Sequence, residues 1–368
     1  MIKLLYITNK TFGPGGLERV LSIKASYLAD HLDYEVHIVT LDQEDEEMFY
    51  DFSPNIIHHD IVTSSNPIRF LRSYVKGLRK VVKEIDPDVI SVCDDGLKGF
   101  LVPLLIGKPC SMIYERHVSK NIEIKSVTPS LKSRIFTNLK FRLMNFGGKK
   151  YDHFVVLTNG NLKEWNFKNL KVIPNPLSFY PEGQSTLNNK KVLAVGKQSY
   201  QKGYDRLLQS WKLVTDTYPD WTLDIYGTIN ANERLDKIAS DLKITEKINF
   251  YEPVRNIADK YQEASIYVMS SRYEGFGMVL TEAMAYGVPC VSFDCPHGPS
   301  DIISDKENGI LIEKDNIEDF AEGIMFLIHN VEDRKRMGDK ARNSVKRYLP
   351  ESVVNEWDQL FVNLIRKN

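Results

Sequence analysis

The chain alternates short β-branched runs with longer amphipathic stretches, and it does so in two series. This alternation is typical of βα units, whose parallel strands are covered on both faces. The pattern breaks over 172–190, where three prolines and a cluster of Ser, Asn, Gly and Thr precede the next apolar run. We therefore expect an α/β protein with two Rossmann-like domains. The strand-like runs are 3–8, 35–41, 88–92, 110–115 and 154–158 in the first series, and 192–195, 222–226, 248–251, 266–269 and 288–293 in the second.

Length agrees with this division, because 368 residues exceed what one ordinary core holds. We expect a first domain over 1–178, a second over 179–350 and a closing segment over 351–368. Within that segment, Val354, Trp357 and Phe361 recur at helical spacing, which predicts an amphipathic helix. We expect this helix to pack back toward the N-terminal domain.

Composition excludes several classes of protein. With 42% hydrophobic and 26% charged residues the chain is in the globular range, and its net charge of −1 argues against nucleic-acid binding. Four cysteines without a Cys-x-x-Cys pair do not make a disulfide framework, which favours the reducing cytosol. The first apolar run is too short for a signal peptide, and no run reaches the roughly 18 apolar residues of a membrane helix. We predict a cytoplasmic protein.

Two glutamates, Glu274 and Glu282, bracket a Gly-Phe-Gly turn and the start of a predicted helix. A helix that begins near Gly277 carries Glu282, and it leaves Glu274 in the preceding loop. Backbone N–H groups at a helix start bind phosphate or sugar oxygens, and a carboxylate can accept two hydrogen bonds from ribose hydroxyls. On spacing alone, two solvated surface acids are the simpler interpretation.

Two further features lie where predicted strands end. The GPGG turn at 13–16 lets the backbone approach a ligand closely, but it does not read G-x-G-x-x-G, which disfavours a nicotinamide cofactor. His117 follows the run CSMIYER at the carboxyl end of a strand, the edge where open α/β sheets bind ligands. A structural histidine is an equal alternative. The spacing of Cys290, Cys295 and His297 lacks a fourth zinc ligand, so we expect no metal there.

The segment 270–294, SSRYEGFGMVLTEAMAYGVPCVSFD, resembles the retaining glycosyltransferases of family 4. It contains their E-x7-E signature, from Glu274 to Glu282, and their AMAxGxP motif as AMAYGVP. The resemblance covers most of the chain and includes GGLERV at 15–20, the strand ending in His117, IPNPL at 173–177 and GKQSYQKG at 196–203. It implies a GT-B fold of two facing Rossmann-like domains, no metal or other cofactor, and retention of the donor's anomeric configuration.

The resemblance also implies roles for individual residues. Glu282 would bind the donor ribose, while Glu274 and His117 would contact the transferred sugar. Lys197 and Lys202 would neutralise the donor diphosphate as point charges, although the family commonly has arginine at the first position. The remaining donor-binding positions are Gly15 and Gly16, which would border the phosphates, and Gly275, Phe276, Gly277, Met278 and Val279, whose backbone would line the pocket.

The predicted activity is thus retaining, metal-independent transfer of a hexose from a nucleotide-sugar to an acceptor hydroxyl. The loop CPHGPSD at 295–301 resembles that of family members that use UDP-galactose-type or UDP-N-acetylhexosamine donors, which implies a UDP-hexose or UDP-N-acetylhexosamine. Departures from the family pattern at Thr228 and at 251–253 leave base and sugar open. The expected acceptor is a glycan or lipid-linked saccharide of bacterial surface polysaccharide. Two alternatives stay open: another GT-B enzyme such as a nucleotide-sugar epimerase or a phosphorylase, and an inactive nucleotide-sugar-binding subunit.

Two basic amphipathic stretches in the first half are typical of helices that lie on anionic lipid. The first, 69–83, has six cations and no acid; the second, 120–150, has eight cations and one acid, Glu123. An ordinary solvated helix face is the alternative. These stretches suggest an anionic membrane surface as a partner, with the protein peripheral on the inner face of the plasma membrane.

Overall fold

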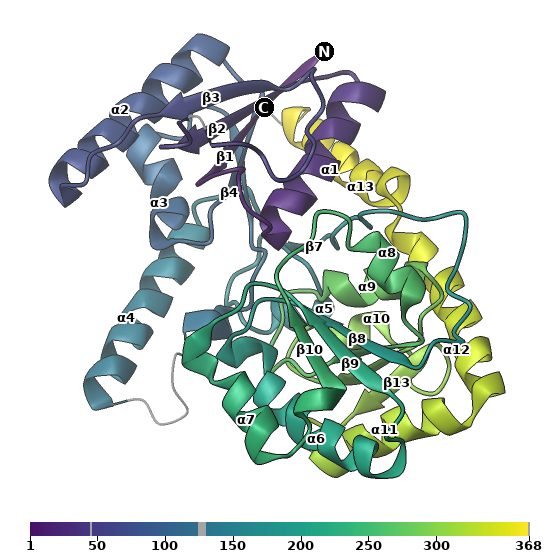
Figure 1. Ribbon diagram of the computed structural model, residues 1–368. Coiled ribbons are helices and arrows are strands. Elements are labelled where there is room, and N and C mark those ends of the chain that lie inside the picture. Colours follow the sequence, from purple (N-terminus) through teal and green to yellow (C-terminus); the bar gives the residue numbers. More distant parts are fainter. Residues whose placement is uncertain (45, 124–129, 367–368) are drawn as a thin grey trace. The chain divides into compact units, whose positions relative to one another are not determined.

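The computed structural model describes residues 1–44, 46–123 and 130–366, and the chain divides into two compact units. Unit 1 comprises Met1–Ser178 and Pro350–Asn368, and unit 2 comprises Phe179–Leu349. The chain therefore leaves unit 1 after Ser178 and returns to it with its last helix, α13 (Pro350–Ile365) (Figure 1).

Unit 1 is built on a parallel sheet of seven strands in the order β3-β2-β1-β4-β5-β6-β7. The central strands β4 and β5 are buried along their whole length, as their apolar sequences require of strands covered on both faces. The strands are β1 Ile2–Thr8, β2 Tyr34–Leu41, β3 Ile57–Ile61, β4 Val89–Cys93, β5 Ser111–Glu115, β6 His153–Val156 and β7 Leu170–Val172.

The helices of unit 1 pack against this sheet and form two separate hydrophobic cores with it. One core joins α1 (Gly16–His31) to α13, through residues such as Leu28 and Phe361. The other holds Leu78 and Met144, from α2 and α4. The remaining helices of unit 1 are α2 Pro67–Ile85, α3 Leu97–Ile106, α4 Leu131–Gly148, α5 Asn159–Leu162 and the 3₁₀ turn η1 Lys120–Glu123.

Unit 2 is built on a parallel sheet of six strands in the order β10-β9-β8-β11-β12-β13. Its strands are β8 Lys191–Val195, β9 Thr222–Tyr226, β10 Ile248–Tyr251, β11 Ile266–Met269, β12 Cys290–Phe293 and β13 Gly309–Ile312. Its helices are α6 Tyr204–Thr217, α7 Leu235–Asp241, α8 Ala258–Glu263, α9 Met278–Ala285, α10 Pro299–Ile302, α11 Ile317–His329 and α12 Val331–Ser344, with 3₁₀ turns η2 Tyr200–Lys202, η3 Ala231–Glu233, η4 Thr245–Lys247 and η5 Val345–Tyr348.

Two parallel, helix-covered sheets confirm the predicted α/β class with two Rossmann-like domains. Three strands were not predicted. All three lie at sheet edges, namely β3, β7 and β13, and β7 has only three residues. Among the helices within the described ranges, none has the length and apolarity that crossing a membrane requires.

Candidate active site

In each sheet the strand order reverses at one point, between β1 and β4 in unit 1 and between β8 and β11 in unit 2. Open α/β sheets bind ligands outside the carboxyl ends of the strands at such a point. The segments after β8 and β11 carry Lys197, Lys202 and Glu274, and the segment after β1 carries Gly15 and Gly16. The predicted site residues therefore fall into two groups, one in each unit.

In unit 2 the structure brings Lys202 and Glu274 together. Lys202 Nζ lies 2.7 Å from Glu274 Oε1, and Ser271 Oγ donates a hydrogen bond of 2.6 Å to the same oxygen. Glu274 is only 6% exposed, so the ion pair is largely screened from water on the carboxylate side. Glu274 is thus the counter-ion of Lys202 in this structure.

Lys197 is exposed on the turn that follows β8. Tyr204 supports this turn by donating a hydrogen bond of 2.9 Å from its hydroxyl to the Gly196 carbonyl. Lys197 and Glu274 both belong to the described residues, and the ion pair that Glu274 forms there is with Lys202, not with Lys197. Of the two predicted cations, only Lys202 is held in place by an acid.

The loop between Glu274 and α9 is buried and closely packed. Gly275, Phe276 and Gly277 are buried, and Met278 and Val279 are half-buried at the start of the helix. Gly277 precedes α9 with a φ of 97°, in the left-handed region that favours glycine. The Glu274 N–H donates to the carbonyl of Pro296, which ties the loop to the segment after β12. These contacts fix the backbone that leads into the helix.

Glu282 lies inside unit 2. It is 1% exposed, and the Tyr261 hydroxyl donates a hydrogen bond of 2.9 Å to its Oε2. The alternative that Glu274 and Glu282 are solvated surface acids is therefore wrong. The two carboxylates nonetheless have different partners, Lys202 for Glu274 and Tyr261 for Glu282.

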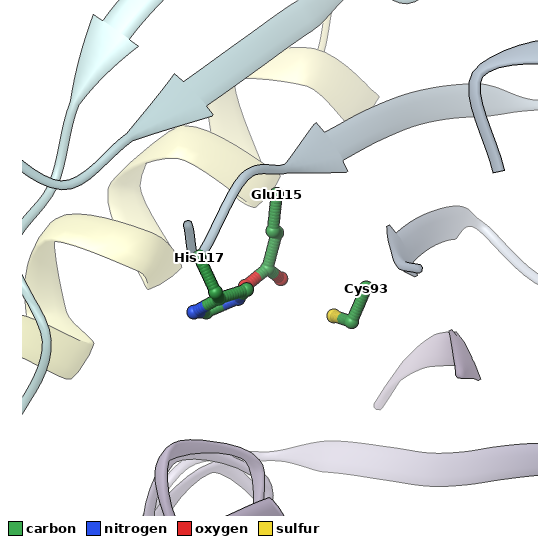
Figure 2. Close-up of side chains that lie close together, drawn as sticks. All are labelled: Cys93, Glu115 and His117. Carbon is green, nitrogen blue, oxygen red and sulfur yellow. The ribbon is translucent and has the colours of Figure 1, made fainter. Parts of the chain in front are cut away.

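In unit 1, His117 belongs to a buried polar cluster after β5. Its Nε2 lies 3.1 Å from Glu115 Oε2 (Figure 2). The same carboxylate accepts hydrogen bonds from Lys24 and from Ser91. Burial alone would raise the pKa of Glu115, but the Lys24 charge and the His117 hydrogen bond lower that pKa to about 2. An ionised Glu115 fixes the proton of His117 on Nε2.

Lys24 and Glu115 were missed by the sequence analysis. Both side chains are 1% exposed, and aromatic rings enclose the ammonium: the Trp357 centroid is 3.9 Å from Nζ and the Tyr6 centroid 5.0 Å. Lys24 lies in α1, Glu115 ends β5 and Trp357 lies in α13. The sequence signal was a lysine within the apolar face of α1, where a cation requires a buried partner.

Cys93 completes a group whose ligand atoms lie within 4.8 Å of one another, together with Glu115 and His117. Figure 2 shows the Cys93 thiol across from the other two side chains. Burial raises the pKa of Cys93 well above its ordinary value, and the Glu115 charge adds to the effect. A metal requires the thiolate, and Lys24 already balances Glu115, so these residues fit a metal ion poorly.

Gly15 immediately precedes α1, and Gly16 is its first residue. The Glu18 side chain, which was not among the predicted site residues, lies against Gly15. A Cβ atom on Gly15 would lie 2.0 Å from the Glu18 carboxylate, whereas Gly16 faces open space. Burial raises the pKa of the Glu18 carboxyl above its ordinary value, although its own backbone N–H and the Lys10 charge oppose this rise. Glu18 follows the paired glycines inside the GGLERV motif, which was the available signal.

A surface hollow of about 450 Å³ lies elsewhere, at the amino ends of β4 and β5, and its lining includes Asp88, Lys108 and Cys110. This is the edge opposite the one that carries the predicted residues. At the carboxyl edge, strand reversal and buried charges meet, and open α/β sheets bind their ligands there.

Comparison with known proteins points to one family. Residues 181–344 match the family model described as glycosyl transferases group 1. An uncharacterized glycosyltransferase of Haemophilus influenzae is 31% identical over 362 residues, covering 97% of this chain and 99% of that protein. The amylovoran biosynthesis glycosyltransferase AmsD of Erwinia amylovora is 27% identical, covering 98% and 99%.

Solved structures agree on the fold. The crystal structure of Anabaena HepE in complex with UDP-glucose superposes with a TM-score of 0.80 at 16% identity, covering 99% of this chain and 100% of that one. At that identity the likeness concerns the fold, which is the two-domain GT-B architecture of glycosyltransferases.

Proposed function

Because this chain belongs to the group 1 glycosyltransferases, we propose that it is a retaining, metal-independent hexosyltransferase of family 4. The proposed donor is a UDP-hexose or UDP-N-acetylhexosamine. HepE, which shares the fold, was crystallised with UDP-glucose, and this supports a UDP-sugar. The E-x7-E spacing of Glu274 and Glu282 supports the family 4 assignment.

The observation that carries the proposal is the pairing of Lys202 with Glu274 at the strand reversal of unit 2. A diphosphate carries more negative charge than one carboxylate, so it can replace Glu274 as the partner of Lys202. Glu274, once released, is an acceptor for hydroxyl groups of the adjoining sugar. Binding of the donor therefore frees the Glu274 carboxylate to orient the sugar.

Glu282 has the proposed role of holding the donor ribose. A carboxylate has about four acceptor sites, so Glu282 has the chemical capacity to accept from ribose hydroxyls as well as from the Tyr261 hydroxyl. Tyr261 fixes the orientation of this carboxylate before the donor arrives. Such preorganisation reduces the entropy lost on binding.

The proposed reaction breaks the bond between the anomeric carbon and the diphosphate oxygen and forms a bond from the acceptor oxygen on the same face. The acceptor proton passes to the departing diphosphate, so no side chain need act as a strong base. Lys202, Lys197 and backbone N–H groups stabilise the charge that develops on the leaving group. Glu274 orients the sugar. Within unit 1, Glu115 fixes the tautomer of His117.

We place the acceptor among the glycans or lipid-linked saccharides of bacterial surface polysaccharide synthesis. The likeness to AmsD, named for amylovoran biosynthesis, supports this class of acceptor. A lipid-linked acceptor would bring the enzyme to the cytoplasmic face of the plasma membrane, where the lipid carries the growing saccharide.

A thermal-shift screen of UDP-, GDP- and ADP-sugars in excess EDTA tests the donor and the absence of a metal. We expect UDP-sugars to raise the unfolding temperature, because a ligand at 100 times its Kd stabilises the folded state by about 2.7 kcal/mol. A requirement for added metal, or stabilisation by GDP- or ADP-sugars alone, would contradict the proposal. Glu282→Gln is the matched variant, and it should weaken binding of UDP and of uridine alike.

Stereochemistry tests the reaction. With UDP-glucose or UDP-N-acetylglucosamine and a panel of soluble glycosides, proton NMR of the product should show the anomeric configuration of the donor. An inverted linkage would remove the chain from family 4. Epimerised donor without transfer would instead identify the epimerase alternative.

A further inference from the structure

Helix α4 of unit 1 exposes a continuous apolar stripe. Six large side chains along it are between 38% and 73% exposed: Leu131, Ile135, Phe136, Leu139, Leu143 and Phe146. At 3.6 residues per turn these positions span about 140° of the helix circumference, so they form one face. Isolated exposed apolar residues are ordinary, whereas a contiguous row marks an interaction surface.

A few buried residues hold α4 on unit 1. Met144, Gly147 and Gly148 are buried, and the helix contacts α3. All three residues belong to the last turns, which leaves the first turns extending from the sheet of unit 1 (Figure 1). The stripe therefore occupies the side of α4 that unit 1 leaves uncovered.

The charged residues along α4 and at its two ends are all positive. The stretch 130–150 contains six cations and no acid: Lys132, Arg134, Lys140, Arg142, Lys149 and Lys150. Lys150 Nζ lies 5.0 Å from the ring centroid of Phe146, so a cation borders the apolar row directly. An apolar face flanked by cations is complementary to an anionic bilayer, in which acyl chains lie beneath phosphate groups. A second copy of this chain would bring the same positive charge to the contact.

The other basic helix, α2, is built differently. Its apolar side chains Tyr74, Leu78 and Val82 face the core, and Arg79 donates a hydrogen bond to the Leu105 carbonyl. The structure also removes one cation from the second basic stretch. Lys120 is buried against the Phe141 and Trp165 rings, and burial lowers its pKa, while Lys125 lies outside the described residues. The two stretches are thus equivalent in the sequence but not in the structure.

We propose that α4 is an interfacial helix, whose apolar stripe enters the headgroup region of an anionic membrane and whose cations bind lipid phosphates. This inference goes beyond the transfer reaction and stands on the surface of α4 alone. It names the element by which a peripheral enzyme would reach a lipid-linked acceptor.

Co-sedimentation of the full-length protein with vesicles tests the proposal. The parent should bind phosphatidylcholine vesicles that contain phosphatidylglycerol, and bind phosphatidylcholine alone at least tenfold more weakly. Phe136→Ser with Leu139→Ser should lower the partition coefficient at least tenfold, because the apolar area is lost. Lys132→Gln with Arg134→Gln should lower it about tenfold at low salt and less at high salt.

The matched control removes two cations from the other basic helix. Arg72→Gln with Lys76→Gln makes the same charge change in α2 and should alter partitioning less than about threefold, because α2 exposes only two large apolar side chains, Ile68 and Leu71, against the six of α4. UDP binding and the thermal unfolding midpoint should match the parent in all three variants, since the exchanged side chains lie on the surface. If the parent fails to bind UDP, the proposed function fails while the vesicle result still stands.

A fluorescent probe locates the contact. An environment-sensitive label on Leu139→Cys should shift to shorter wavelength with anionic vesicles, whereas the same label on Ser133→Cys, on another side of α4, should shift less. The unmodified protein corrects for labelling of Cys110, the only native cysteine of the described residues that is not buried. Absence of vesicle binding by the parent at low salt would overturn the proposal. So would a stripe variant that dissociates an oligomer but leaves vesicle binding unchanged.

Discussion

At the scale of single residues, each unit pairs a lysine with a buried glutamate at its group of predicted site residues. Lys202 and Glu274 meet in unit 2 across 72 residues of sequence, and Lys24 and Glu115 meet in unit 1 across 91. The first pair is accessible on its lysine side, which is 19% exposed, and the second is closed to water. This difference predicts that the first pair exchanges partners on binding, while the second maintains structure.

Replacing Lys202 with Ala should therefore weaken UDP binding about 10- to 100-fold while changing uridine binding less than about twofold, because charge-assisted hydrogen bonds contribute about 1.5–3 kcal/mol. Isothermal titration calorimetry with the two ligands measures the difference. Lys212→Ala is the control, since Lys212 pairs with Asp216 on the exposed surface of α6. Equal losses for UDP and uridine would mean that Lys202 does not face the diphosphate.

The buried pair predicts a pH dependence. Because the pKa of Glu115 is lowered from 4.5 to about 2 in the folded state, ionised Glu115 stabilises the fold fully above pH 4.5. That contribution is lost as the pH falls toward 2. Glu115→Gln should cost about 3–5 kcal/mol at neutral pH, since Lys24 is left buried without a counter-ion. The difference in free energy of unfolding between wild type and Glu115→Gln should become smaller as the solution is acidified.

Hydrogen exchange of unit 1 peptides at several pH values measures this effect. Lys24→Met combined with Glu115→Gln is the control, because it removes both charges and should be less damaging than either single change. If wild type and Glu115→Gln differ by the same free energy of unfolding at pH 7 and at acid pH, ionised Glu115 is not what stabilises unit 1.

Sequence reasoning named both residues of one pair, though not their contact, and neither residue of the other pair, for a physical reason. Lys202 and Glu274 follow strands that lie side by side, and each falls within a motif, so both could be named in advance. Lys24 and Glu115 belong to a helix and a strand whose contact depends on tertiary packing. In a single sequence, the one sign of such a pair is a charged residue at a position where the pattern predicts an apolar one. Burial of Glu282 beside Tyr261 was hidden in the same way.

At the scale of elements, apolar runs flanked by turns predicted the central strands of both sheets, because strands buried on two faces read as continuous apolar sequence. The edge strand β3 escaped prediction because its sequence, IHHDI, mixes apolar with polar residues that are exposed or half-buried. Helices α2 and α4 show the opposite problem. Their compositions are alike, but only the packing of Tyr74 and Leu78 distinguishes a helix whose apolar side is buried from one whose apolar side is exposed.

At the scale of the whole molecule, unit 1 depends on a helix that follows unit 2 in the sequence. Helix α13 buries six apolar residues: Val353, Val354, Trp357, Leu360, Phe361 and Leu364. At about 1.5–3 kcal/mol for each buried side chain, its contribution is comparable with the net stability of a domain, about 5–15 kcal/mol. It also supplies the Trp357 ring that covers Lys24.

Deleting 350–368 should consequently unfold unit 1 and leave unit 2 folded. Hydrogen exchange mass spectrometry should show loss of protection in β1, β2 and α1, with protection retained in β8 and β11. A shorter deletion from Arg366 onward, beyond α13, is the control and should change neither unit. Unchanged protection in β1 after the longer deletion would show that unit 1 stands without the helix.

The return of α13 to unit 1 also sets an order of events during synthesis. Unit 2 is continuous from Phe179 to Leu349, whereas unit 1 remains incomplete until the residues after Leu349 have left the ribosome. At 5–20 residues per second, translating unit 2 takes roughly 10–35 s. Throughout that interval the nascent chain presents the uncovered faces of α1 and its sheet. The yield of folded enzyme in the cell therefore depends on how well chaperones shield that surface until the last helix arrives.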